Sequence, residues 1–299
     1  MTQVEIASLQ EALRALPASE QLGFMKGWLA RHPDEKVKAT FTAFWGLIKE
    51  LPPDSISTPT RDQIVVLLHG IRTEAVWQSM VCRELSKLPN VKVYPVGYGW
   101  LDAFRFWLPF GRMKSKEKIL RELRDIKTKH EGSPFTVIAH SFSTFLISEI
   151  FNDHPDIMVN KLILCGSIIP RDFRWDKIPS STGGMLVVNE VGTRDIWPVL
   201  ARVTSWGYGC SGTMGFQTAR VTDRYFDYGH SDFFQENHIS KYWVPFVQNG
   251  TINSSSWDTL RSSQPWLVQL FGNMPFIKLL ILGFLIGLYW LVSRLIDAI

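Results

Sequence analysis

The sequence is poor in cysteine, and the cysteines that it has are isolated. Only three are present, Cys82, Cys165 and Cys210, and no two of them form a C-x-x-C pair. This argues against a disulfide framework and against a zinc ribbon. Cys82 and Cys165 lie in apolar surroundings, which favours reduced core residues and a cytoplasmic location for the body of the protein. No metal-ligand spacing occurs, so we expect neither a metal nor an organic cofactor.

The sequence also has no dense tract of one charge. The net charge is +4, with the basic residues spread along the chain. Nucleic acid is therefore not expected as a partner, whereas a mild basic excess favours an anionic membrane surface. The first residues, 1–8, contain neither a positive segment nor an apolar run. We accordingly expect no signal peptide.

What the chain does contain is enough apolar sequence for a large core. It has 299 residues, of which 45% are hydrophobic. Apolar runs with the character of buried strands alternate with helical stretches, which predicts an α/β fold with a mostly parallel sheet flanked by helices. The expected strands are Ile64–Leu68, Val91–Val96, Phe135–Ala139, Lys161–Cys165, Met185–Val188 and Arg220–Tyr228.

Changes in composition divide the chain into four parts. Residues 1–52 have helical periodicity and end at a Pro/Ser linker over Leu51–Thr60. They could pack as a cap on the rest, or bind a partner or a second copy of the chain. The α/β domain is expected over residues 62–248, and residues 249–274 are expected to form a polar spacer and an amphipathic approach.

The fourth part, residues 275–295, is almost continuously apolar. About 17 to 25 apolar residues are needed to span a bilayer. The stretch is just long enough, with Lys278 and Arg294 able to reach the two interfaces. A buried core helix is the alternative. We expect a C-terminal transmembrane anchor, hence a single-pass membrane protein with membrane lipids as partners.

The stretch Phe135–Thr144 contains the strongest chemical signal. A buried strand stops at His140-Ser141-Phe142-Ser143 and a helical stretch follows, so a serine stands at the bend, with the small residues Ala139 and Ser143 on either side. Alone, this could be a Ser-rich loop closing a strand. It resembles the nucleophile elbow of α/β-hydrolases, with both glycines of Gly-x-Ser-x-Gly replaced by small residues. The resemblance implies an esterase- or lipase-like serine hydrolase.

The resemblance also implies an oxyanion hole. His69-Gly70 follows the first expected strand about seventy residues before the elbow, where the family places one backbone donor. The N–H of Ile71 or of Arg72 would be this donor. The N–H of Phe142, directly after the serine, would be the other.

The remaining triad members follow in the order of the same family. Asp195 lies in the loop after the strand that starts at Met185, with Glu190 as a weaker rival for the acid, and His230 follows the last expected strand. The resemblance implies that His230 takes the proton of Ser141 and that Asp195 orients the imidazole. Carboxyl-ester cleavage through an acyl-enzyme follows.

Aromatic residues suggest the kind of substrate. The stretch Tyr98–Phe110 could be a lid or a membrane-dipping segment, or a loop packed into its own core. We expect Trp100, Phe104, Trp107 and Trp197 to bind substrate, and tethering to a bilayer favours acyl lipids. Two other functions stay open: a non-catalytic membrane adaptor with a hydrolase-like body, and a hydrolase switched by its N-terminal helices.

Overall fold

The computed structural model describes residues 62–69, 76–97, 109–178, 184–260, 266, 270 and 277–297. Several predictions fall outside these ranges. They are the helices expected over residues 1–52, the donors Ile71 and Arg72, and the aromatic residues Trp100, Phe104 and Trp107. The expected sheet and the three expected triad residues lie within the described part.

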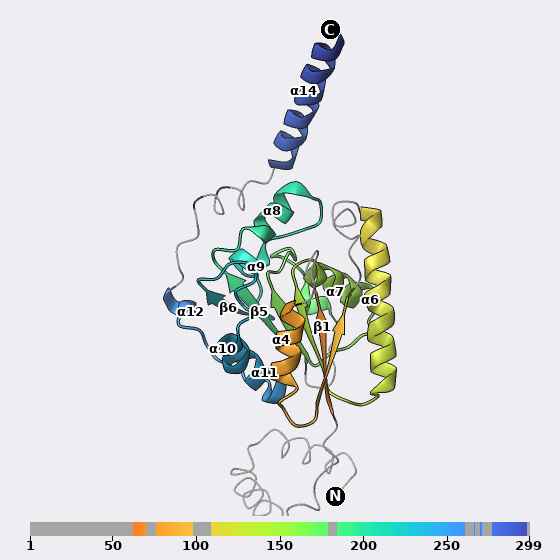
Figure 1. Cartoon of the computed structure of the whole chain (residues 1–299), viewed down its shortest axis with the longest axis vertical. Helices are drawn as coiled ribbons and strands as arrows, with labels where there is room; N and C mark the ends of the chain where they lie inside the picture. The colour runs from red at the N-terminus through yellow and green to blue at the C-terminus, as the bar shows by residue number, and fades with distance from the viewer. Residues whose placement is uncertain are drawn as a thin grey trace, which may run out of the picture. The chain divides into compact units, whose positions relative to one another are not determined.

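A six-stranded parallel sheet forms the centre of the described body (Figure 1). The strand order is β2-β1-β3-β4-β5-β6. The strands are β1 (Gln63–Leu68), β2 (Val91–Val96), β3 (Phe135–His140), β4 (Lys161–Cys165), β5 (Leu186–Gly192) and β6 (Thr222–Phe226). Every residue of β3 is buried. Such a strand needs cover on both faces of the sheet, and helices supply it.

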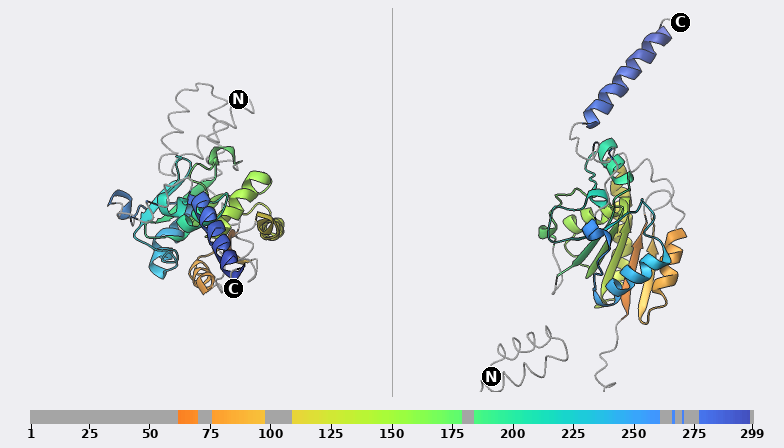
Figure 2. Two further views of the ribbon diagram at one scale, coloured as in Figure 1. Left: turned by 90° about the horizontal axis from the view of Figure 1, so that it is seen from above. Right: turned by 90° about the vertical axis from the view of Figure 1, so that its left-hand side faces the viewer.

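Helices pack on both faces of the sheet (Figures 1 and 2). On one face Leu123 of α6 and Leu146 of α7 join Val137 of β3 in an apolar cluster. On the other face Val81 of α4 and Trp243 join Ile138 of the same strand. The helices are α4 (Val76–Leu85), α6 (Pro109–Lys129), α7 (Phe142–Asp153), α8 (Trp197–Thr204), α9 (Ser211–Met214), α10 (Glu236–His238), α11 (Val244–Asn249), α12 (Trp257–Leu260) and α14 (Ile277–Asp297), with the 3₁₀ turn η2 (Trp175–Lys177) and the π-helical turn η3 (Ile239–Trp243). The predicted α/β class is confirmed.

Two elements are longer than the apolar pattern indicates. The sequence pattern predicts a charged amphipathic helix over Ser115–His130, but α6 begins earlier, at Pro109, because proline is well suited to the first turn of a helix, where its missing N–H costs nothing. Strand β5 runs on to Gly192 although Asn189 and Glu190 are polar. Both of these side chains are buried and hydrogen-bonded, so the strand can hold them.

The C-terminal segment forms helix α14. Of the helices in the described ranges, none is both long and apolar enough to cross a membrane. The transmembrane anchor expected over residues 275–295 is therefore not supported by these helices.

Candidate active site

Ser141 occupies a sharp turn between β3 and α7. Its backbone has φ 57° and ψ −123°, and within the described ranges Asn90 is the one other non-glycine residue with a positive φ. The Ser141 N–H donates to the Cys165 carbonyl over 2.9 Å, while the Thr144 hydroxyl donates to the Ser141 carbonyl over 2.6 Å. The strand–turn–helix geometry expected of a nucleophile elbow is therefore present, with the conformational strain that such a turn carries.

The two small residues around the turn have different roles. Ala139 is fully buried in the sheet, where its small side chain leaves room for the turn. The Ser143 hydroxyl, by contrast, donates a hydrogen bond to the backbone carbonyl of His69 at the end of β1. Ser143 thereby ties the turn to the neighbouring strand end, a role that a glycine could not fill. Sequence reasoning used Ser143 for its small size alone and missed this bond.

His230 is hydrogen-bonded to Asp195. The His230 Nδ1 lies 2.8 Å from the Asp195 Oδ2, and the Asp195 side chain is completely buried. The other carboxylate oxygen accepts the backbone N–H of Trp197 over 3.0 Å, while the Thr213 hydroxyl donates to the Asp195 backbone carbonyl. A carboxylate oxygen only accepts, so the His230 Nδ1 carries the proton of this bond, and Nε2 is the ring nitrogen that Asp195 does not engage.

The His230–Asp195 pair lies beside the turn that holds Ser141. A Cβ placed on Gly166 would lie only 2.7 Å from the His230 Cε1 and 3.3 Å from the Asp195 Oδ2. Gly166 directly follows Cys165, whose carbonyl accepts the Ser141 N–H. With its φ of +55°, Gly166 allows the imidazole to approach the backbone beside the serine.

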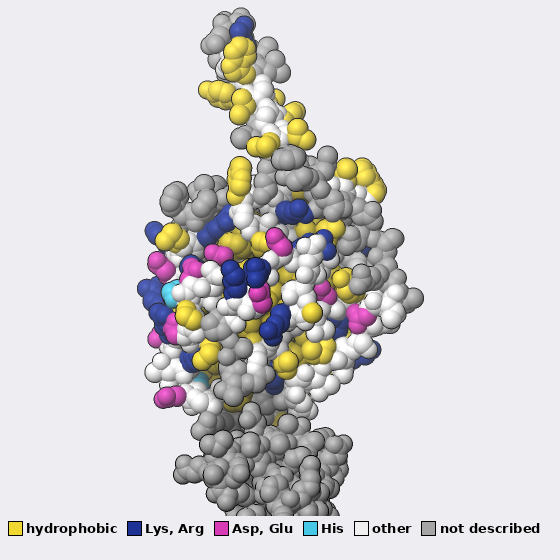
Figure 3. All heavy atoms as spheres, turned by 180° about the vertical axis from the view of Figure 1, so that it is seen from behind, with side chains coloured by type: hydrophobic (Ala, Val, Ile, Leu, Met, Phe, Trp, Pro, Cys, Tyr) yellow, Lys and Arg dark blue, Asp and Glu magenta, His cyan; other side chains and the backbone are white. Residues whose placement is uncertain are grey.

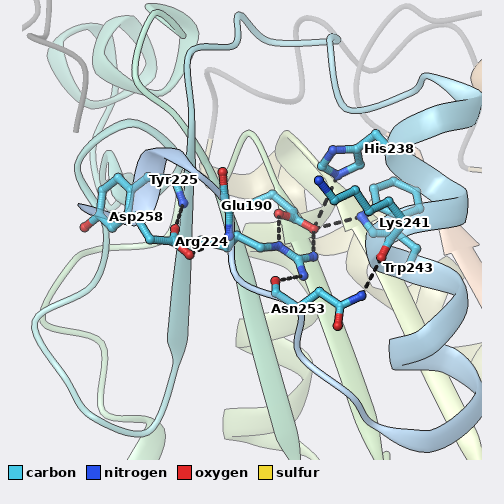
Figure 4. A network of polar contacts seen from close by, with 9 residues as sticks. Glu190, Arg224, Tyr225, His238, Lys241, Trp243, Asn253 and Asp258 are labelled. Carbon is cyan, nitrogen blue, oxygen red and sulfur yellow. Dashed lines mark hydrogen bonds and ion pairs between the residues drawn. The ribbon is translucent and has the colours of Figure 1, made fainter. Parts of the chain in front are cut away.

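Glu190, the rival candidate for the triad acid, belongs to a different network of polar contacts, with Arg224, Trp243 and His238 (Figure 4). Its carboxylate accepts hydrogen bonds from Arg224 and, over 2.8 Å, from the Trp243 Nε1, and it lies 3.5 Å from His238. Burial alone would raise the pKa of Glu190, but the positive charge of Arg224 and the contact with His238 outweigh it and lower the pKa to about 2. The position of Asp195 against His230 makes Asp195 the candidate acid.

The Gly- and aromatic-rich stretch around residues 206–216 packs closely on the exit of β4. A Cβ on Gly209 would lie 2.3 Å from the Pro170 Cα, and one on Gly212 would lie 2.1 Å from the Ser167 N. Arg112 of α6 holds the same stretch, since it donates to the Trp206 carbonyl over 2.8 Å and stacks on the Tyr208 ring. These glycines serve a close backbone contact next to Gly166.

Two further predicted site residues, Trp197 and Phe142, lie within the described ranges. Trp197, at the start of α8, is 60% exposed, and its ring centroid lies 6.3 Å from that of His230. Phe142 is the first residue of α7, as its expected role as a backbone donor requires, and its side chain is buried. Across the described ranges, no group of three His, Cys, Asp or Glu residues could hold a metal ion.

Comparisons with known proteins find similarity in structure alone. No protein-family model matches the chain, and none of the curated sequences compared with it is similar. One similar solved structure is a protein of unknown function from Agrobacterium tumefaciens, with 17% identity, a TM-score of 0.42, and 60% of this chain and 88% of that chain covered. Another is an esterase domain from Rhodothermus marinus, with 11% identity, a TM-score of 0.40, and coverage of 66% and 89%.

A third similar structure is a cutinase-like protein from Cryptococcus sp. It has 8% identity and a TM-score of 0.39, and 65% of this chain and 97% of that chain are covered. Similarity at this level does not bear on what this protein does. The candidate site is therefore defined by its own geometry.

Proposed function

We propose that this protein is a serine hydrolase that cleaves carboxyl esters through an acyl-enzyme intermediate. The observation that carries the proposal is the pairing of a strained, non-glycine turn at Ser141 with a His230–Asp195 hydrogen bond of 2.8 Å against the adjacent Gly166. A strained serine at a strand–helix turn, beside a histidine oriented by a buried carboxylate, is a combination typical of nucleophilic catalysis.

In the first half-reaction the Ser141 Oγ attacks the acyl carbonyl carbon, and its proton passes to the His230 Nε2. Asp195 accepts the Nδ1–H and stabilises the imidazolium that forms. The negative oxygen of the tetrahedral intermediate is held by the Phe142 N–H and by that of Ile71 or Arg72. The intermediate collapses, the C–O bond breaks, and the alcohol leaves with the proton from His230.

In the second half-reaction water attacks the acyl-enzyme. His230 takes a proton from the water, and the same backbone donors hold the second tetrahedral intermediate. Its collapse releases the carboxylic acid and returns the proton to the Ser141 Oγ. Neither half-reaction requires an electron acceptor or a further co-substrate.

Hydrolysis of p-nitrophenyl esters tests this proposal. Ser141→Ala should abolish turnover, and Asp195→Asn should lower kcat by about 10⁴-fold, since the imidazole then loses its correct tautomer. Ser148→Ala is the matched control, because Ser148 is a buried serine of α7, the helix that follows Ser141, and its hydroxyl donates to the Phe145 carbonyl. It should keep the wild-type kcat. A wild-type protein without turnover would favour the non-catalytic adaptor instead.

We further propose that the substrates are acyl lipids or similar long-chain esters. Trp197 supports this, since an exposed indole beside His230 offers an apolar surface to an acyl chain. Trp197→Ala should raise KM for long-chain esters more than for acetate esters. Trp206, which is 61% exposed and lies just beyond the C-terminal end of α8, gives the control variant Trp206→Ala. Equal KM changes for all chain lengths would contradict the lipid proposal. So would the same rate of hydrolysis of long-chain esters with and without lipid vesicles.

Attachment to a membrane is a separate proposal. Large apolar side chains of α14 are exposed to solvent, among them Phe284, Tyr289 and Trp290, and Figure 3 shows hydrophobic side chains along this helix. So much exposed apolar surface favours insertion into a lipid layer. The full chain should float with lipid vesicles, whereas a chain ending at residue 272 should not. Flotation of both would place the attachment elsewhere.

A further inference from the structure

His140 precedes Ser141 and is buried in the apolar layer beneath the candidate site. The side chain is 2% exposed. The edge of the Trp77 ring lies against it, with a centroid separation of 6.0 Å, and Phe234 packs at 4.9 Å in a similar edge-on arrangement. In the sequence, the placement of its backbone in the turn is enough to explain His140. The structure shows its ring enclosed between α4 and the loop after His230.

The ring makes a specific hydrogen bond. The His140 Nε2 lies 3.0 Å from the backbone carbonyl oxygen of His230. A carbonyl only accepts, so the Nε2 carries the proton of this bond. Within the described ranges the Nδ1 has no hydrogen-bond partner. The ring is therefore held by one donated bond.

The environment keeps this ring neutral. Burial lowers the pKa of His140 well below its usual value, and the neighbouring His230 and His69 rings act in the same direction. His230 is in turn hydrogen-bonded to the Asp195 carboxylate. The centroid of the His140 ring lies 4.6 Å from that of His230. Because the His140 ring is neutral, it does not repel the positive charge that His230 acquires when it takes up a proton.

The two hydrogen bonds fix His230 at opposite ends. Asp195 holds the ring through Nδ1, and His140 holds the backbone through the carbonyl oxygen. The two histidine rings pack at an interplanar angle of 47°. Gly166 limits movement of the imidazole on the side of the serine turn. The loop that carries the base is thus attached directly to the residue before the nucleophile.

We propose that His140 is a positioning residue that holds His230 at the distance from Ser141 at which proton transfer occurs. The inference rests on the proposed function, because it assigns His140 a part in that reaction. Since His140 and Ser141 are adjacent in the chain, the bond from the His140 ring fixes the base relative to the nucleophile. Displacement of a catalytic group by about 1 Å can cost about 10²-fold in rate.

Three variants test the proposal with p-nitrophenyl ester hydrolysis. His140→Phe keeps an aromatic ring but removes the donor, so kcat should fall by about 10²-fold with little change in KM. His140→Gln keeps an N–H near the position of Nε2 and should restore most of the loss. His140→Met removes the donor with a flexible side chain, and it replaces the Phe variant if that variant does not fold.

Phe246→Leu is the control for lost packing. Phe246 is fully buried in the apolar cluster that also contains Trp77 and Phe234, and it belongs to α11. This variant should lower the urea midpoint of unfolding and leave kcat unchanged. A His140→Phe protein with wild-type kcat would overturn the proposal, and so would a Gln variant no better than the Phe or Met variant.

The same assays separate this inference from the proposed function. Turnover that survives Ser141→Ala, or no turnover by the wild type, would refute the proposed function and the role of His140 with it. Turnover that depends on Ser141 but is indifferent to His140 would refute only the role of His140.

Discussion

At the scale of single residues, the candidate site combines strain with close polar contacts. Ser141 has φ 57° and ψ −123°, a region that glycine adopts readily and other residues adopt at a cost of about 1–3 kcal/mol. The surrounding bonds hold it there, including the 2.9 Å bond from its N–H to the Cys165 carbonyl. A serine kept in a conformation that suits glycine supports the proposal that its hydroxyl takes part in the reaction.

This strain predicts an unusual order of stability. Ser141→Gly should be more stable than Ser141→Ala by roughly 1 kcal/mol, because relief of strain exceeds the extra entropy that glycine gives the unfolded chain. At Ser148, inside α7, the order should be reversed, since glycine is a poor helix former. Urea unfolding of the four variants measures both differences. Alanine more stable than glycine at both positions would show that the turn is unstrained.

The sequence pattern predicted the bond partners His230 and Asp195 as candidates on one edge of the sheet, but not all of the contacts around Ser141. Ser141, Asp195 and His230 each follow a strand, and the carboxyl ends of parallel strands share one edge of the sheet. The roles of His140 and Ser143 could not be predicted, because they depend on where each side chain points after a tight turn. Strand alternation does not determine that direction.

At the scale of elements, the close contact between α9 and the exit of β4 shapes the site. The stretch that holds Gly166 packs against Gly212 with no room for another atom. In a sequence, a stretch so rich in glycine is typical of a flexible loop or of tight turns. The glycines instead allow two backbones to touch, a reason that the sequence alone does not reveal.

Gly212→Ala should therefore destabilise the protein. Its Cβ would lie 2.1 Å from the Ser167 N and 2.6 Å from the Gly166 carbonyl carbon, and backbone atoms cannot move aside as a side chain can. Overpacking of this kind costs about 1–3 kcal/mol. Gly283→Ala in α14 has open space around its Cβ and should not lower the urea midpoint, because alanine is the better helix former. Equal midpoints for both variants would mean that the contact is loose.

The buried ion pair of Glu190 and Arg224 joins β5 to β6. Both side chains are essentially inaccessible to solvent, and Trp243 and the Asn253 carbonyl complete their hydrogen bonds. Arg224→Met alone should cost about 3–5 kcal/mol, because it leaves a buried carboxylate unpaired. Replacing both residues by methionine should recover most of this loss. If the single and double variants unfold at the same urea concentration, lost packing rather than lost pairing is responsible.

The same pair predicts a dependence of stability on pH. The folded-state pKa of Glu190, about 2, is lower than that of an ordinary glutamate, so its contribution is complete above about pH 4.5 and is lost as the pH falls toward 2. Urea unfolding between pH 5 and pH 2 should therefore show a steeper loss for the wild type than for the double methionine variant. Parallel curves would contradict the lowered pKa.

At the scale of the whole molecule, a buried parallel sheet covered by helices explains why the chemistry lies where it does. Alternation of apolar strands with helical stretches predicted the sheet and its cover, and both are confirmed. Glu190 was harder to place from the sequence. Apolar patterning ended its strand too early, because buried and paired polar residues look like loop residues.

The central claim is that Ser141 is the nucleophile, and covalent labelling tests it most directly. A fluorophosphonate should react with the wild-type protein, and mass mapping of its peptides should find one adduct, on Ser141. Ser141→Ala should not be labelled, Asp195→Asn should be labelled far more slowly, and Ser148→Ala should react like the wild type. Equal labelling of the wild type and Ser141→Ala, or an adduct on another residue, would contradict the account.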